Sequence, residues 1–209
     1  MKHKFTTMIM ALAAMGALAT QANAVTFDFQ SNGSNVNLGN TSTFTVGGFS
    51  LTASGFLTNG TPTDLFSKFT LGNPTETGLG TNIDAEKEVN TTDFIQLTLP
   101  TTPPSNFTMV LLASVQSGEQ ALVYFQPLSS PGTLVGATLI GTITNADGSV
   151  TIPAGDQTGF IDITAGAANI LLESATISSV PDSGSAVALL GIALAGIEGV
   201  RRAFRARKA

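Results

Sequence analysis

Short apolar runs in which every second residue is polar dominate the chain between residues 25 and 180. The first run, 25–30, reads Val-Thr-Phe-Asp-Phe-Gln, and Gly, Asn, Pro, Ser and Thr separate it from the rest. Later runs occupy residues 44–46, 49–53, 66–71, 94–99, 107–115, 121–125, 138–144, 150–152, 160–163 and 169–178. A period of two is typical of strands that bury one face. This spacing, without a long helical period, predicts an all-β fold, a jelly-roll-like antiparallel β-sandwich over residues 25–178.

The segments between these runs give finer predictions. The sequence Ala146-Asp147-Gly148 lies between two β-rich runs and predicts a hairpin, and Asn59-Gly60 predicts a turn. The Gly-, Ser- and Thr-rich residues 31–43 indicate a mobile polar loop, and 177–179 indicate a short tether after the last strand. A domain of this length can bury a core without disulfides, and the chain has no cysteine.

The supply of reactive and charged side chains restricts the function. Histidine occurs once, at His3, and cysteine not at all, so histidine- or cysteine-based catalysis and ordinary zinc sites are not expected. Between residues 25 and 180 the sequence has two basic residues, Lys68 and Lys87, and twelve acidic ones, which gives this region a net charge of −10. Such a field repels phosphate backbones, so nucleic acid is not an expected partner.

The N-terminus has the layout of a secretory signal. Lys2 and Lys4 precede an apolar run at 8–19, and Ala22-Asn23-Ala24 follows it. Small residues at these positions fit signal peptidase, so we predict a signal peptide over residues 1–24 that is removed after Ala24. A retained membrane helix is the alternative, but the apolar stretch is short for one.

The C-terminal residues predict a membrane span. Residues 186–200 are mostly apolar, although they include Glu198, and a basic cluster follows at Arg201, Arg202, Arg205, Arg207 and Lys208. A helix of about 15 residues measures roughly 22 Å, so spanning a hydrocarbon layer of about 30 Å needs snorkelling or local thinning. A buried helix is the alternative, but it has no need of a basic cluster. The positive-inside rule places that cluster in the cytoplasm and the body outside the inner membrane.

Just before this span stands a short motif, made up of Val180, Pro181, Asp182, Ser183 and Gly184. With the apolar run and the arginines, it resembles the VPDSG variant of the PEP-CTERM sorting signal, over residues 179–209. The resemblance implies recognition by an exosortase, removal of the span, and transfer to the surface or exopolysaccharide matrix of a Gram-negative bacterium. Pro181 prevents regular strand pairing, so the motif is expected to be an exposed extended strip. Asp182 or Ser183 would equally serve as the N-cap of the next helix.

The densest polar group of the body precedes the run at 94–99, and it comprises Asp84, Glu86, Glu88, Asn90 and Asp93. If the segment is extended, the first four side chains share one face. Calcium, which takes six to eight oxygen ligands, would relieve their repulsion. The alternative is a solvated acidic loop or edge strand that resists aggregation.

The same carboxylates suit a glycosidase, with Glu88 and Asp93 as the acid pair. No neighbouring residue in the sequence would separate their pKa values. Aromatic platforms for sugar rings are also scarce, because Trp is absent and Tyr occurs once. Tyr124 lies in an apolar run and is expected in the core or on a sheet face. The leading hypothesis is therefore an exported, non-enzymatic protein with a structural or adhesive role in exopolysaccharide. Its alternatives are a calcium-assisted glycan-binding module and a carbohydrate-active enzyme. No cofactor other than calcium is expected.

Overall fold

The structure is a computed structural model, and it describes residues 23–30, 33–73, 76–99, 105–128, 131–180, 191 and 194–197. The chain divides into two units. One is Ala24–Ser179, and the other combines Met1–Asn23 with Val180–Ala209. Most of the second unit, including the predicted signal peptide, lies outside the described residues; residues 191 and 194–197 are helical.

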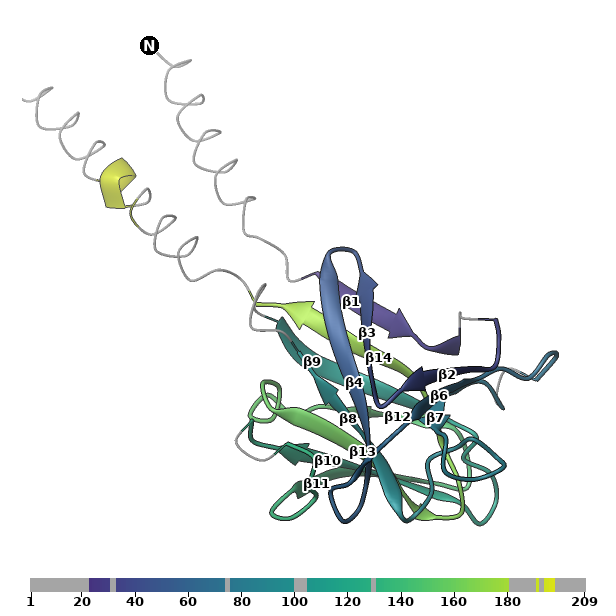
Figure 1. Ribbon diagram of the computed structural model, residues 1–209. Helices are drawn as coiled ribbons and strands as arrows, with labels where there is room; N and C mark the ends of the chain where they lie inside the picture. The colour runs from purple at the N-terminus through teal and green to yellow at the C-terminus, as the bar shows by residue number, and fades with distance from the viewer. Residues whose placement is uncertain are drawn as a thin grey trace, which may run out of the picture. The chain divides into compact units, whose positions relative to one another are not determined.

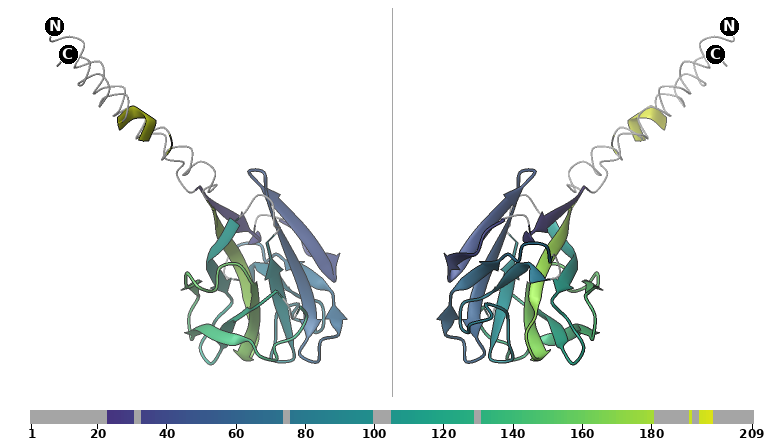
Figure 2. Two further views of the ribbon diagram at one scale, coloured as in Figure 1. Left: turned by 90° about the vertical axis from the view of Figure 1, so that its left-hand side faces the viewer. Right: turned by 90° about the vertical axis from the view of Figure 1, so that its right-hand side faces the viewer.

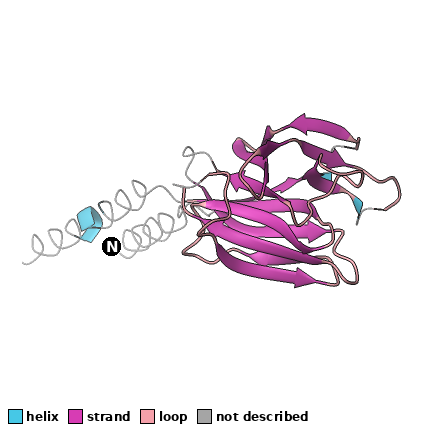
Figure 3. Ribbon diagram, turned by 60° about the horizontal axis from the view of Figure 1, so that its bottom comes forward, coloured by secondary structure: helices cyan, strands magenta, loops and turns pink. Residues whose placement is uncertain are grey.

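The Ala24–Ser179 unit is an antiparallel two-sheet sandwich, as the alternating sequence predicted (Figure 1). Sheet A has the order β12 (Gly148–Thr151), β9 (Ser105–Ala113), β14 (Leu171–Ser179), β7 (Gly78–Thr81), β6 (Leu65–Lys68) and β2 (Val36–Gly39), and β1 (Ala24–Asp28) also pairs with β14. Sheet B has the order β11 (Thr138–Thr144), β10 (Gln120–Gln126), β13 (Phe160–Ala167), β8 (Asp93–Thr98), β4 (Phe49–Leu57) and β3 (Thr41–Val46), and β5 (Pro62–Thr63) also pairs with β4. Figure 3 shows that strands and loops make up this unit almost entirely.

The core lies between the two sheets and is built from alternate residues of their strands (Figure 2). Sheet A contributes residues such as Phe27, Phe107 and Leu172, and sheet B contributes residues such as Leu97 and Ile163. Because successive side chains of a strand point to opposite faces, the residues between these core positions form the outer face of each sheet. The period of two therefore determines which side chains are available for binding.

Three local predictions were wrong. Residues 31–43 are not simply a loop, because β2 and the start of β3 lie there. Residues 177–179 are not a tether, because β14 continues to Ser179, which pairs with Ser105 of β9. The 146–148 turn does not make a hairpin: β11 belongs to sheet B and β12 to sheet A, so the chain changes sheets there. The predicted turn at Asn59-Gly60 is confirmed, since β4 and β5 pair on either side of it.

Strand β7 was missed because Gly78-Leu79-Gly80-Thr81 shows little apolar alternation. Its glycines have a packing role: a Cβ on Gly80 would lie 2.2 Å from the carbonyl oxygen of Lys87. The acidic segment thus packs directly on the β7 backbone. No helix within the described residues has the length and apolar character needed to cross a membrane. The span predicted at 186–200 lies mainly outside those residues.

Candidate functional site

The acidic segment between β7 and β8 is a compact bent loop, so the extended arrangement that would place four of its side chains on one face is not formed. Lys87, with a positive φ of 60°, reverses the chain in its middle. The Asp84 carboxylate accepts hydrogen bonds from the Lys87 backbone N–H at 2.9 Å and from the Asn90 side-chain amide at 3.2 Å. These hydrogen bonds to the Asp84 side chain hold the loop in place where the backbone does not form a regular strand.

Asp93 lies at the end of this loop, at the start of β8, and is fully buried. One of its oxygens, Oδ1, accepts hydrogen bonds from the Thr81 hydroxyl at 3.0 Å and from the Asn90 backbone N–H at 3.1 Å. Burial, together with a smaller contribution from the nearby Asp84 charge, raises the pKa of Asp93 to about 6 despite these hydrogen bonds.

Glu88 points to a different group of partners. Its carboxylate forms an ion pair with Lys68, which also lies 3.2 Å from the Glu76 carboxylate. The Ser114 hydroxyl donates to Glu76 at 3.3 Å and to Glu88 at 3.4 Å. We call Lys68, Glu76, Glu88 and Ser114 the charged cluster. Their side chains come from β6, from the loops on either side of β7, and from the end of β9.

Burial and charge oppose each other in the charged cluster. Burial favours neutral Glu88 and outweighs the attraction of Lys68, so the pKa of Glu88 is raised above its ordinary value. Burial alone would lower the pKa of Lys68, but its hydrogen bonds and charge interactions with Glu88 and Glu76 raise it overall. Lys68 is thus held protonated between two glutamates, with which it forms ion pairs.

The five residues predicted to bind calcium therefore do not converge. Asp84, Asn90 and Asp93 form one hydrogen-bonded group, whereas Glu88 belongs to the charged cluster. The side chain of Glu86 is exposed. Within the described part of the chain, no three His, Cys, Asp or Glu side chains are grouped so as to hold a metal ion. The predicted glycosidase pair, Glu88 and Asp93, has its two carboxylates bound to different partners.

Sequence reasoning missed a line of polar side chains on the outer face of sheet B. Register pairs Thr41 with Ser54, Ser54 with Gln96, Gln96 with Asp162, and Asp162 with Tyr124. We call these five residues the outer polar row; they cross β3, β4, β8, β13 and β10. Part of the signal was present in the sequence, because Gln96 and Asp162 each lie between two core residues of an alternating run, but strand order was needed to align the row.

One end of the outer face is rich in exposed hydroxyl groups. On β3 and β4, Thr41 contacts Ser54 at 3.1 Å, Thr43 contacts Thr52 at 3.1 Å, and Thr45 contacts Ser50 at 3.2 Å, each pair through its side-chain oxygens. These pairs carry no charge. They form one column of hydroxyls on each strand, and the pair of Thr41 and Ser54 also belongs to the outer polar row.

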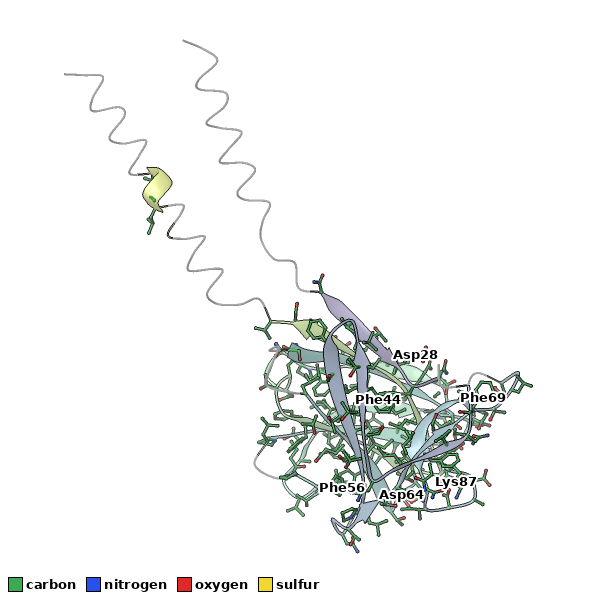
Figure 4. All side chains as sticks on the ribbon, turned by 45° about the horizontal axis from the view of Figure 1, so that its top comes forward. Asp28, Phe44, Phe56, Asp64, Phe69 and Lys87 are labelled. Atoms are coloured by element: carbon green, nitrogen blue, oxygen red, sulfur yellow. The ribbon has the colours of Figure 1, made fainter. Side chains whose placement is uncertain are left out.

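The other end of the outer face is covered by residues 131–137, which we call the strap. Gly132 donates its backbone N–H to the Gln96 side-chain oxygen at 3.1 Å, and the Gln126 amide donates to the Val135 carbonyl at 3.3 Å. Gly132, with a φ of +72°, also lies against the ring of Phe56. Figure 4 shows Phe56 at the lower end of the sandwich in that view, and its ring stacks on Phe94 with centroids 5.4 Å apart.

Asp162 lies beneath the strap and is fully buried. Its Oδ1 accepts a hydrogen bond from the Gln96 amide at 2.8 Å. Its Oδ2 has no hydrogen-bond partner among the described residues. Burial raises the pKa of Asp162 to about 7, against the lowering effect of the Gln96 hydrogen bond.

The predicted sorting motif begins immediately after the sandwich. β14 ends at Ser179, and Val180 follows it as a partly exposed residue without regular structure. Pro181, Asp182, Ser183, Gly184 and the basic cluster lie outside the described residues. The VPDSG-CTERM motif family matches residues 179–204. The chain carries a VPDSG-CTERM sorting motif. This confirms the predicted resemblance, indicates an exported, cell-surface-targeted protein, and implies processing by an exosortase.

No curated protein matches the chain. Among solved structures, the chain is similar to CBM29_1, a family 29 carbohydrate-binding module from Piromyces equi, with 13% sequence identity and a TM-score of 0.39. That similarity covers 70% of this chain and 91% of the module.

Proposed function

We propose that this VPDSG-CTERM protein is exported by the signal peptide at 1–24 and held by a membrane helix at 186–200. An exosortase then releases it to serve a structural or adhesive role in the exopolysaccharide matrix of a Gram-negative bacterium. The observation that carries the proposal is the match at residues 179–204, which begins at the last residue of the last strand of the sandwich. The repeated crossing of the chain between sheets, from β8 to β9 to β10, supports the jelly-roll-like form of the exported module.

Intact mass spectrometry of the surface fraction tests this processing. We expect a mature protein that lacks residues 1–24 and the basic cluster. In a host without exosortase, or with Pro181→Ala and Gly184→Ala in the motif, the cluster should remain and the protein should stay with the membrane. A surface protein that keeps Arg201 and Lys208 in an exosortase-positive host would contradict the proposal.

A second candidate function is the binding of a neutral glycan on the outer face of sheet B. The exposed hydroxyl pairs of β3 and β4 favour it, because such groups both donate to and accept from sugar hydroxyls. The body carries a net charge of −10, which disfavours anionic polysaccharides. Because these pairs contain no carboxylate, binding through them needs no calcium.

Affinity measurements on neutral and acidic polysaccharides, with and without chelator, test this candidate. The Thr43→Val, Thr52→Val double variant should weaken binding, since valine keeps the shape and removes the hydroxyl. The matched control is Thr26→Val with Thr176→Val, which removes a similar pair, 2.9 Å apart, from sheet A. Equal affinity of both double variants would argue against the outer face. Loss of binding with chelator would instead favour the calcium-assisted alternative.

The proposal includes that the protein does not cleave polysaccharide, and a separate assay tests this. Incubation with each polysaccharide should release no new reducing ends. Release that the Glu88→Gln, Asp93→Asn double variant abolishes would establish the enzyme alternative.

A further inference from the structure

The strap lies over a carboxyl group for which the fold supplies no positive charge. The side chains that face Asp162 from the neighbouring strands are Gln96 on β8 and Tyr124 on β10, and Gln126 lies diagonally across on β10. Among these, Tyr124 is the only titratable residue. The described strap, residues 131–137, has no ionisable side chain.

Both lysines of the sandwich are engaged elsewhere. Lys68 belongs to the charged cluster, and the Lys87 ammonium lies 5.8 Å from the centre of the Phe66 ring. An ionised Asp162 would therefore be a buried anion with one hydrogen bond, an arrangement that is strongly unfavourable. Within the described residues, two buried oxygens at this place lack a hydrogen donor, Asp162 Oδ2 and Gln126 Oε1.

A proton on Asp162 removes the unfavourable charge and turns one acceptor into a donor. Gln126 pairs with Phe160, two residues before Asp162 on the same face of β13, so the two side chains are diagonal neighbours. Diagonal pairs of this kind lie within reach of long side chains. A protonated Asp162 can thus donate toward the Gln126 oxygen while it still accepts from Gln96.

The strap is connected to this carboxyl through the same two glutamines. Gln96 donates to Asp162 with its amide nitrogen and accepts from Gly132 with its oxygen. Gln126 holds the strap at Val135. Val135 is itself 83% exposed, so little apolar burial holds the strap down at that residue. Any movement of Asp162 toward water therefore disturbs both hydrogen bonds that attach the strap, the one at Gly132 and the one at Val135.

We propose that the strap is a proton-controlled cover, closed over the outer polar row while Asp162 is protonated and lifted when Asp162 ionises. Lifting hydrates the carboxylate and uncovers Gln96 and the adjoining part of sheet B. The raised pKa of Asp162, about 7, places this change near neutral pH. The proposal does not depend on glycan binding, because it concerns the strap alone.

The direction of the pH dependence follows from proton linkage. The closed state binds the proton more tightly than the open state, in which Asp162 has an ordinary carboxyl pKa. Closure is therefore most favourable below about pH 4. From there, the opening equilibrium should rise about tenfold per pH unit until it levels off near pH 7. Between pH 5 and pH 7 the expected increase is about 50-fold, because the rise is already levelling off at pH 7.

Hydrogen exchange measured by mass spectrometry on the full chain in detergent tests this proposal. Exchange rates of peptides covering residues 131–137, divided by the intrinsic rate at each pH, give the opening equilibrium. In the wild type, the strap should show the pH dependence above, while the β3–β4 hairpin should not. In Asp162→Asn, the strap should stay protected at all pH values, because the amide is neutral and can donate to Gln126.

The matched control is Asp93→Asn, which removes another buried carboxyl with a raised pKa but leaves the strap contacts intact. It should keep the wild-type pH dependence of the strap. A strap in the wild type whose corrected exchange does not change with pH would overturn the proposal, as would an Asp162→Asn strap that follows the wild-type curve. If Asp162→Asn does not fold, Gln126→Met serves instead: it removes an attachment and should raise strap exchange at every pH.

Discussion

The charged cluster of sheet A and the Asp162 site of sheet B both bury a carboxyl group, but they stabilise it in different ways. Both place a carboxyl group where water has little access. In the charged cluster, Lys68 lies against Glu88 and Glu76, and their side chains are 16%, 7% and 18% exposed. At the Asp162 site, two neutral glutamines and the strap surround a fully buried group. A buried carboxylate with a cation can remain ionised, whereas one without a cation favours its protonated form. The first arrangement stabilises the fold, and the second makes it sensitive to pH.

The largest expected effect comes from removing the cation. Lys68→Met leaves two partly buried glutamates facing each other, and we expect a loss of about 3 kcal/mol in the free energy of unfolding at pH 7. Urea denaturation measures this loss. The matched control is Lys87→Met, whose contact with Phe66 should contribute less than about 1 kcal/mol.

The pH dependence of that loss sharpens the comparison. Without Lys68, burial and the charge of Glu76 both raise the pKa of Glu88. The folded variant then binds a proton more tightly than the unfolded chain, so the deficit of Lys68→Met should shrink as the pH falls from 7 toward 5. A deficit that is constant over this range, or equal to that of Lys87→Met, would show that Lys68 contributes only packing.

Asp162→Asn should raise the free energy of unfolding, whereas Lys68→Met should lower it. At pH 8 Asp162 is ionised in the wild type. Keeping this carboxylate buried, or lifting the strap to expose it, costs free energy, and the neutral asparagine of the variant avoids that cost. We expect the variant to be more stable by about 1 to 2 kcal/mol at pH 8 and nearly equal to the wild type at pH 4. Thermal or urea unfolding at both pH values measures this difference. A variant less stable than the wild type at pH 8 would mean that the carboxylate is compensated in a way that the contacts do not show.

The sandwich and the sorting motif were predictable because both are local signals. Alternation located most strands, since a strand such as β4, in which every second residue is buried, needs only its own residues to define its buried face. Strand β7 was missed, because its glycines are required by contacts that only the fold creates: Gly80 meets the Lys87 carbonyl, and Gly78 meets the backbone of Leu172 on β14. Strand β2 was missed as well, because polar residues on a short strand look like a loop.

The polar sites were less predictable, for a physical reason. An extended acidic segment would gather its charges on one face, but the chain bends at Lys87, which has a positive φ, and the charges are separated. Lys68 and Glu88 lie 20 residues apart in the chain, and Gln96 and Asp162 lie 66 apart. A sequence reports which side chains are available, whereas strand order decides which of them meet. Asp162 stood in an apolar run without any sign that a strap would bury it.

The smallest expected effect separates the strap contact from backbone strain. Gly132 and Gly136 both have positive φ, at +72° and +81°, so alanine at either position should cost about 1 kcal/mol. A Cβ on Gly132 would also lie 2.9 Å from the Phe56 ring, whereas one on Gly136 meets nothing within 4 Å. Phe56 cannot shift freely, because it stacks on the buried Phe94. Gly132→Ala should therefore lose about 1 kcal/mol more than Gly136→Ala. It should also raise hydrogen exchange in the strap at every pH without removing the pH dependence that Asp162 confers. If the two variants lose the same stability, the strap does not press on Phe56, and the two glutamines alone would hold it.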